Sequence, residues 1–307
     1  MAKKPNILIT LAIAATLVTA LSFVLPKDAE KYLAELFWTR KTFAPAKYNV
    51  VIMGDSRVYR GLSPEIMESH LPGLKVLNFA YSNGGLNQTM FVAAEKKLAQ
   101  NANPKIILLG ISANAISGYS AQNQQYVQEL NRPREEIFER IYFNPLRYWF
   151  SATSPEKLKN HYSETKETAF YRNKYFMNGY VESEKFPADT MEAIPSYTKD
   201  FANYKVTPKN LSDLFKQVKK WTDSGIIVAG FIPPVSQPMQ MLEDTLGRFD
   251  ETVIKTGFEM ASGHWIDVNP NKYKTYDGSH LNIESARKLS NEIAEEVQQL
   301  TVIQEKK

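Results

Sequence analysis

The sequence has no cysteine among its 307 residues. Disulfide bonds, thiolate metal sites and cysteine nucleophiles are therefore excluded. Histidine is also scarce, with four residues in the whole chain, so histidine-based chemistry has few candidates. Charge of one sign is nearly balanced by the other, since 37 Lys and Arg against 33 Asp and Glu give a net charge of +4. An excess this small does not predict binding to nucleic acid, which needs a concentrated basic face.

Two kinds of binding motif are missing as well. No cluster of His, Asp and Glu has the spacing of metal ligands, so no metal site is predicted. No glycine-rich phosphate loop follows the first predicted strand, which argues against a nucleotide, and no other cofactor is expected. Hydrophobic residues make up 43% and charged residues 23% of the chain. This composition is typical of a globular protein and excludes disorder and collagen-like structure.

Long apolar runs are absent except near the amino terminus. Residues 7–25 are uncharged and follow Lys3 and Lys4. A helix of this length is roughly 28 Å long, enough to cross a hydrocarbon core of about 30 Å. The lysines predict that the amino end stays in the cytoplasm and the rest is exported. We expect a membrane anchor at 1–26; the alternatives are a signal peptide cleaved near Val18-Thr19-Ala20 and a buried soluble helix.

The rest of the sequence predicts one α/β domain. Residues 27–48 mix charged and aromatic side chains and predict a juxtamembrane helix and linker. Short apolar runs then predict strands at 49–53, 75–79, 105–109, 225–232 and 264–268. Helical patterns lie at 86–100 and from Ile283 to Leu300. Strands that alternate with helices indicate a parallel sheet with helices on both faces, within a domain over 49–307.

The stretch 115–215 breaks this alternation. It holds ten of the sixteen tyrosines and predicts a large helical and irregular insertion between the third and fourth strands. Aromatic-rich surfaces suit binding of carbohydrate or a partner, because the rings offer a large contact area with a polar tip. The alternative is that the rings only pack the insertion onto the sheet.

A candidate nucleophile follows the first strand, in Gly54-Asp55-Ser56-Arg57. Residues at the carboxyl ends of strands lie where open α/β sheets bind ligands. If a helix begins near Arg57, its positive end favours an alkoxide at Ser56 and an oxyanion beside it. The alternative is that Asp55 or Ser56 only caps the helix. Arg57 has two possible roles, binding an anionic substrate or pairing with a carboxylate.

A candidate base and its orienting acid stand just before the last helix, in Asp277-Gly-Ser-His280. A serine hydroxyl needs a base within hydrogen-bond reach, and the base needs a group that fixes its tautomer. Asp277 and His280 are three residues apart, so one loop can supply both. The order along the chain predicts a triad of Ser56, His280 and Asp277.

With these two blocks the chain resembles the SGNH (GDSL-type) hydrolase superfamily, over roughly residues 49–114 and 225–300. The resemblance implies a flavodoxin-like three-layer α/β/α sandwich and serine acyl-enzyme chemistry. It also implies an oxyanion hole made by the amide of the nucleophile, a glycine after the second strand and an asparagine after the third.

Two blocks of the sequence depart from that pattern. The usual glycine aligns with Asn83, or with Gly84 after a shift of one residue, and a backbone N–H can serve at either. After the third strand Ser112 stands in the register of the asparagine, and Asn114 lies two residues further on. Loss of one oxyanion donor typically costs about 10²–10³ in rate. Residues 110–114 also imitate a Gly-x-Ser-x-Gly elbow, which gives Ser112 as an alternative nucleophile, but the final glycine is missing.

The expected function is that of a membrane-anchored, extracytoplasmic serine esterase or O-acyltransferase acting on cell-envelope polysaccharide. The resemblance implies an acyl ester donor, a carbohydrate acceptor and a multi-pass membrane-bound O-acyltransferase as partner, which is an argument by family analogy. The domain would lie in the periplasm or on the cell surface. The alternative is a catalytically weak or inactive SGNH-like subunit that binds glycan or assists a membrane-bound O-acyltransferase.

Overall fold

The computed structural model describes residues 6–24, 30–151, 158–159 and 169–305. Contacts along the chain divide it into two units. The first unit comprises Met1–Arg40 with Arg132–Glu167, and the second comprises Lys41–Asn131 with Thr168–Lys307. Each is described by itself.

The first unit is helical over its described residues. Its helices are α1 (Ile7–Val24), most of α2 (Glu30–Thr42), α8 (Arg134–Tyr142) and α9 (Asn144–Trp149). Asn144 Nδ2 donates to Glu35 Oε2 at 2.9 Å and thereby joins α9 to α2. Within the described residues, none of the helices combines the length and the apolar character needed to cross a membrane. The membrane-spanning helix expected over residues 7–25 is therefore not supported by the structure.

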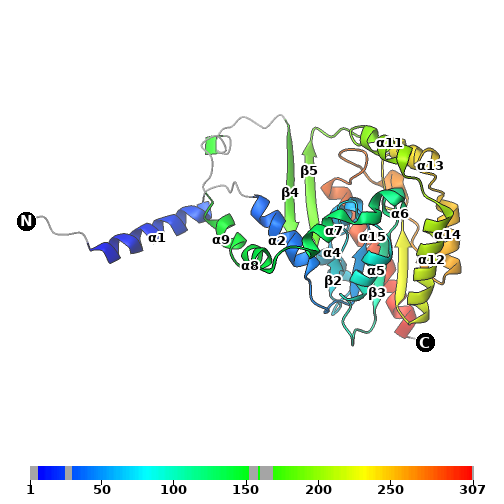
Figure 1. Ribbon diagram of the computed structural model, residues 1–307, viewed down its shortest axis with the longest axis horizontal. Helices are drawn as coiled ribbons and strands as arrows, with labels where there is room; N and C mark the ends of the chain where they lie inside the picture. Colours follow the sequence, from blue (N-terminus) through cyan, green and yellow to red (C-terminus); the bar gives the residue numbers. More distant parts are fainter. Residues whose placement is uncertain (1–5, 25–29, 152–157, 160–168, 306–307) are drawn as a thin grey trace, which may run out of the picture. The chain divides into compact units, whose positions relative to one another are not determined.

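The second unit is built on a five-stranded parallel sheet (Figure 1). The strands are β1 (Val50–Met53), β2 (Val76–Asn78), β3 (Ile106–Gly110), β6 (Ile227–Phe231) and β7 (His264–Trp265), in the order β2-β1-β3-β6-β7. Every residue of β1, β2, β3 and β6 is buried, as in sheets covered on both faces. This is the strand order of flavodoxin-like folds, so the α/β part of the predicted fold class, a parallel sheet within a three-layer fold, is confirmed, although β7 ends before residue 268.

Helices surround the sheet in two groups. The helices of this unit are α3 (Ser56–Gly61), α4 (Pro64–His70), α5 (Gln88–Glu95), α6 (Ala113–Ile116), α7 (Gln124–Leu130), α11 (Ile194–Asn203), α12 (Pro208–Asp223), α13 (Gln237–Thr245), α14 (Glu251–Met260) and α15 (Ile283–Glu305). The long carboxyl-terminal helix α15 packs on α3 and α4. Helix α12 packs on α14 and β6, and its Trp221 meets Phe91 of α5 at 5.2 Å between ring centroids.

The predicted insertion contains a β-hairpin that the sequence analysis did not anticipate. Strands β4 (Phe170–Phe176) and β5 (Tyr180–Phe186) pair in antiparallel register, with Phe170 opposite Phe186. The turn at Asn178-Gly179 needs glycine, because Gly179 has φ +97° and a Cβ there would lie 1.9 Å from the carbonyl oxygen of Asn78. The hairpin tip thus docks on the end of β2, where the Asn78 N–H donates to Asn178 O at 3.0 Å.

Candidate active site

The end of β1 fixes the position of Ser56. Gly54 has φ +150°, and a Cβ there would lie 2.4 Å from Val58 Cγ2 and 2.9 Å from the carbonyl oxygen of Gly110, so no side chain fits. Asp55 is buried and caps α3, since its Oδ1 accepts from the Arg57 N–H at 3.0 Å. Ser56 is the first residue of α3 and is half-buried. The capping role therefore belongs to Asp55 and leaves the Ser56 hydroxyl available.

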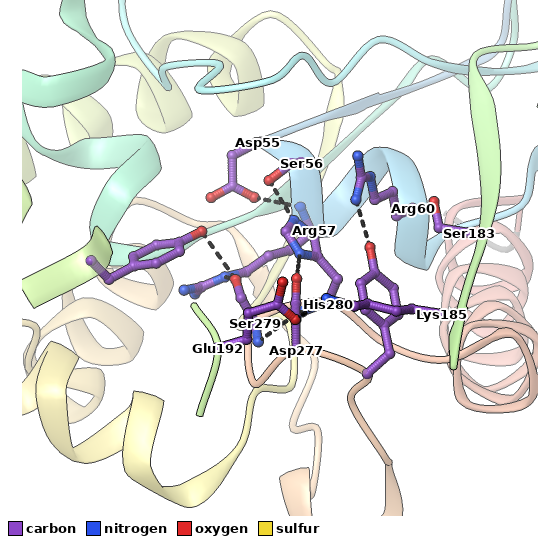
Figure 2. A network of polar contacts seen from close by, with 12 residues as sticks. Asp55, Ser56, Arg57, Arg60, Ser183, Lys185, Glu192, Asp277, Ser279 and His280 are labelled. Atoms are coloured by element: carbon purple, nitrogen blue, oxygen red, sulfur yellow. Dashed lines mark hydrogen bonds and ion pairs between the residues drawn. The ribbon is translucent and has the colours of Figure 1, made fainter. Parts of the chain in front are cut away.

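A continuous hydrogen-bond chain joins the three residues of the predicted triad (Figure 2). Ser56 Oγ lies 2.8 Å from His280 Nε2, and His280 Nδ1 lies 2.7 Å from Asp277 Oδ2. A carboxylate only accepts hydrogen bonds, so the ring proton of neutral His280 lies on Nδ1 and Nε2 accepts from the serine hydroxyl. This is the arrangement in which a histidine can remove the serine proton.

The loop before α15 holds Asp277 and His280 in this geometry. Asp277 Oδ1 accepts from the backbone N–H groups of Ser279 and His280, at 2.9 Å and 2.7 Å. Gly278 between them has φ +91°, and a Cβ there would lie 2.1 Å from the carbonyl oxygen of Thr190. The segment Asp277-Gly-Ser-His280 thus forms a tight turn around the Asp277 carboxylate.

Burial and hydrogen bonding set the protonation states of this pair. Burial lowers the pKa of His280 below its ordinary value, with a smaller opposing contribution from the hydrogen bond to Asp277. Burial alone would raise the pKa of Asp277, but the hydrogen bonds from His280 and Ser279 hold that pKa below its ordinary value. At neutral pH the histidine is therefore an unprotonated base and the aspartate is ionised.

This protonation pattern predicts a pH dependence. A reaction that needs neutral His280 proceeds above the pKa of His280 and is lost as the pH falls through that pKa. Because burial lowers the pKa, we expect the midpoint of the fall in kcat/KM to lie below pH 6.5, the ordinary value for histidine. The measurement is kcat/KM for 4-nitrophenyl acetate between pH 4.5 and 8, with the rate of Ser56→Ala subtracted at each pH. A plateau that ends above pH 7 would contradict this assignment.

Two backbone N–H groups are candidate donors for an oxyanion hole. The Ser56 N–H and the Asn83 N–H have no backbone or side-chain acceptor among the described residues. Asn83 is exposed and has φ +49°, a left-handed conformation that glycine adopts readily and asparagine tolerates. Asparagine is therefore compatible with this position, where the resemblance led us to expect glycine. The Gly84 N–H donates to Tyr81 O at 2.9 Å, so of the two predicted alternatives only the Asn83 N–H is open to a ligand.

The two predicted donors after β3 differ in their hydrogen bonding. Ser112 is fully buried, its hydroxyl donates to Asp55 Oδ2 at 2.6 Å, and its Oγ caps α6 by accepting from the Ala115 N–H. Its single proton is therefore committed, which corrects both the expected oxyanion role of its hydroxyl and the alternative of Ser112 as nucleophile. Asn114 is 2% exposed, and its Oδ1 has no partner within the described residues.

Arg57 lies in a buried ion pair and does not line an open site. It is 2% exposed, its Nη1 donates to Glu243 Oε1 at 2.7 Å and its Nε donates to Ser279 Oγ at 3.0 Å. The Tyr197 ring lies 5.0 Å from its guanidinium carbon, and Ser279 Oγ donates to Tyr197 Oη at 3.0 Å. Of the two roles considered for Arg57, the structure supports pairing with a carboxylate, that of Glu243.

Asn78 holds the nucleophile helix against the sheet, a role that the sequence analysis missed. It is fully buried at the end of β2, and its Nδ2 donates to the carbonyl oxygens of Val58 and Leu62. Its Oδ1 accepts from the Ala80 N–H at 3.2 Å. Both N–H donors and one lone pair of the side-chain amide thus join α3 to the loop that carries Asn83.

No metal site is evident in the part of the chain that the structure describes, since no three residues of the ligating types come together there. His70 Nε2 lies 2.9 Å from Asn291 Oδ1 and joins α4 to α15. His264 is exposed at the start of β7, and His161 lies outside the described residues.

Comparison with known proteins gives fold-level likeness only. No protein-family model matches the chain, and no curated protein matches it. Among solved structures, Est24, a carbohydrate acetylesterase from Sinorhizobium meliloti, is 12% identical, with a TM-score of 0.41 over 83% of this chain and 100% of that one. A putative platelet-activating-factor protein from Streptococcus pneumoniae is also 12% identical, with a TM-score of 0.37 over 93% and 99% of the two chains.

Proposed function

We propose that the chain is a serine esterase or O-acyltransferase that works through an acyl-enzyme at Ser56. The observation that supports this most strongly is the hydrogen-bond chain from Ser56 Oγ through His280 to Asp277, with distances of 2.8 Å and 2.7 Å. Both lie within the roughly 2.6–3.2 Å that proton transfer from a nucleophile to its base requires.

Acylation follows from this geometry. Ser56 Oγ attacks the ester carbonyl while His280 Nε2 takes its proton, and Asp277 stabilises the imidazolium that forms. The negative charge that develops on the carbonyl oxygen is received by the Ser56 and Asn83 N–H groups. The tetrahedral intermediate then collapses, the C–O bond to the alcohol breaks, and His280 returns its proton to the leaving oxygen.

Deacylation uses the same groups in reverse. His280 removes a proton from the incoming hydroxyl, which attacks the acyl carbonyl and releases Ser56. Water as the acceptor gives an esterase, and a sugar hydroxyl gives an O-acyltransferase.

An acceptor in cell-envelope polysaccharide, an extracytoplasmic location and a multi-pass acyltransferase partner are part of this proposal. The location rests on Lys3, Lys4 and the uncharged run over residues 7–25. The polysaccharide acceptor and the acyltransferase partner rest on the resemblance to the SGNH superfamily. The location is tested by fusing the carboxyl end of the full chain to alkaline phosphatase, which is active only outside the cytoplasm. An inactive fusion that is expressed at normal levels would contradict an extracytoplasmic location.

The catalytic proposal is tested with a fluorophosphonate probe on the full chain. Wild type is expected to label at Ser56, Ser56→Ala and His280→Ala are expected not to label, and the exposed Ser69→Ala serves as the control that labels normally. Incubation with 4-nitrophenyl acetate and an oligosaccharide then separates the two reactions, because acetylated sugar seen by mass spectrometry establishes a transferase. Absence of labelling together with equal ester turnover by wild type and Ser56→Ala would favour a subunit that binds without catalysis.

A further inference from the structure

A second arginine of α3 lies beside the triad. Arg60 is four residues after Ser56, so the two side chains lie on the same face of the helix. Its Nη1 donates to Tyr276 Oη at 2.5 Å, and the Tyr276 ring stacks on the His280 ring with centroids 5.7 Å apart and planes at 15°. One tyrosine therefore separates this guanidinium from the general base.

The charge of Arg60 is not balanced by a carboxylate. Within the described residues, no Asp or Glu oxygen lies within 4.0 Å of its guanidinium. Its neighbours are phenols, with the rings of Tyr59 and Tyr171 at 5.3 Å and 5.8 Å from its central carbon. Burial raises the pKa values of Tyr59 and Tyr276, so both phenols are neutral at physiological pH. Arg60 Nε is buried and has no acceptor among the described residues.

Arg57 provides an internal comparison. Both arginines lie on α3, where Arg57 is buried and Arg60 is half-buried. Arg57 is matched by Glu243 at 2.7 Å, as a buried charge normally is. Arg60 differs in having no counter-ion and in keeping contact with solvent, next to Tyr171, which is 47% exposed. An anion arriving from solvent can therefore reach Arg60 but not Arg57.

The chemistry of the guanidinium indicates the kind of group that would complete this site. Its planar fork matches the two oxygens of a carboxylate or phosphate. Side chains four residues apart on a helix have Cβ atoms about 5–6 Å apart, roughly the width of a sugar ring. A group held by Arg60 would therefore sit next to the ester that Ser56 attacks.

We propose that Arg60 is a specificity-determining residue that selects esters carrying a carboxylate or phosphate beside the reacting carbonyl, such as esters of acidic sugars or of dicarboxylic acids. This inference rests on the function proposed above. It predicts that the enzyme distinguishes substrates by charge next to the ester, through one residue that takes no part in the proton transfers.

The test compares matched pairs of esters on the full chain. One pair places the charge on the acyl group, 4-nitrophenyl hydrogen glutarate against 4-nitrophenyl pentanoate. The other places it on the alcohol, acetylated glucuronic acid against acetylated glucose. Wild type is expected to prefer the anionic member of at least one pair by about tenfold or more in kcat/KM, as a charge-assisted hydrogen bond provides. The pair that shows the preference tells which side of the ester carries the anion.

Three variants decide whether Arg60 causes the preference. Arg60→Gln is expected to bring the ratio of the two kcat/KM values close to one, and Arg60→Lys to retain part of it, since a lysine keeps the charge but not the fork. Lys209→Gln removes one positive charge from a side chain that is 83% exposed at the start of α12, and it is expected to keep the wild-type ratio. A wild-type ratio near one, or a preference that Arg60→Gln leaves intact, would overturn the proposal.

Binding separates failure of this inference from failure of the catalytic proposal. The affinity of glucuronic acid acetate and of glucose acetate is measured by calorimetry on Ser56→Ala and on Ser56→Ala with Arg60→Gln. Tighter binding of the acidic ester that depends on Arg60 supports the inference even if wild type shows no Ser56-dependent turnover. Equal binding of both esters to Ser56→Ala would overturn the inference while leaving any Ser56-dependent turnover of neutral esters as support for the enzyme.

Discussion

His280→Ala is expected to lower kcat for 4-nitrophenyl acetate by about 10⁴–10⁶, because Ser56 then has no base to take its proton. Asp277→Asn is expected to cost about 10⁴, since an amide can donate to Nδ1 and thereby hold the ring in the tautomer whose Nε2 carries the proton. His280→Ala removes the hydrogen bonds at 2.8 Å and 2.7 Å and Asp277→Asn reverses their direction, so these are the largest effects on activity that the site predicts.

The effects of substitutions in Ser56, His280 and Asp277 on kcat are also expected to be non-additive. A double variant of Ser56→Ala with His280→Ala is expected to be no slower than the worse single variant, because the first loss already removes the chain of proton transfers. Burst kinetics and kcat are measured for each variant, with Ser69→Ala as a control on the exposed face of α4. If His280→Ala retained a tenth or more of the wild-type kcat, His280 would not be the base.

Glu243→Ala is expected to produce the largest loss of stability. It leaves the guanidinium of Arg57 buried without the carboxylate that lies 2.7 Å away, in a place where both side chains are at most 3% exposed. Removing one partner of a buried pair typically costs about 3–5 kcal/mol in the free energy of unfolding. Urea unfolding of the full chain measures this loss, and Asp213→Ala, which breaks an exposed pair with Lys209, should leave the midpoint nearly unchanged.

The cause of that loss can be isolated by removing both charges. Arg57→Met combined with Glu243→Leu is expected to recover most of the stability that Glu243→Ala loses, because no unpaired charge is then left buried. A double variant that is as unstable as Glu243→Ala would show that packing around Arg57, rather than its unpaired charge, accounts for the cost.

The sheet and the proximity of Ser56, His280 and Asp277 could be predicted from the sequence for two separate reasons. The strands of a parallel sheet are buried on both faces, so they appear as continuous apolar runs such as Val50–Met53 and Ile106–Gly110. Asp277 and His280 share one short turn, so their proximity follows from their spacing. The pairing of that turn with Ser56 came from the order of the elements, and the structure joins the residues across 224 positions.

Other features depend on contacts that no local pattern encodes. Glu243 is 186 positions from Arg57, so nothing in the sequence indicated which carboxylate would neutralise that arginine. The choice between Asn83 and Gly84 depended on which N–H was already bonded, as that of Gly84 is. The β4–β5 hairpin did leave a signal, because Asn178-Gly179 is a typical turn pair between two runs rich in aromatic residues, but the abundance of tyrosines drew attention to binding instead.

The crowding around Val58 has a consequence for any attempt to rebuild this site. Hypothetical Cβ atoms at Gly54 and Gly110 would lie 2.4 Å and 2.3 Å from the same methyl group, Cγ2 of Val58. The backbone that follows β1, just before Ser56, and the end of β3, just before Ser112, therefore both pack against the Val58 side chain on the first turn of α3. Neither loop can be grafted from another protein by itself, since the three positions form a single steric unit that has to be transplanted or varied together.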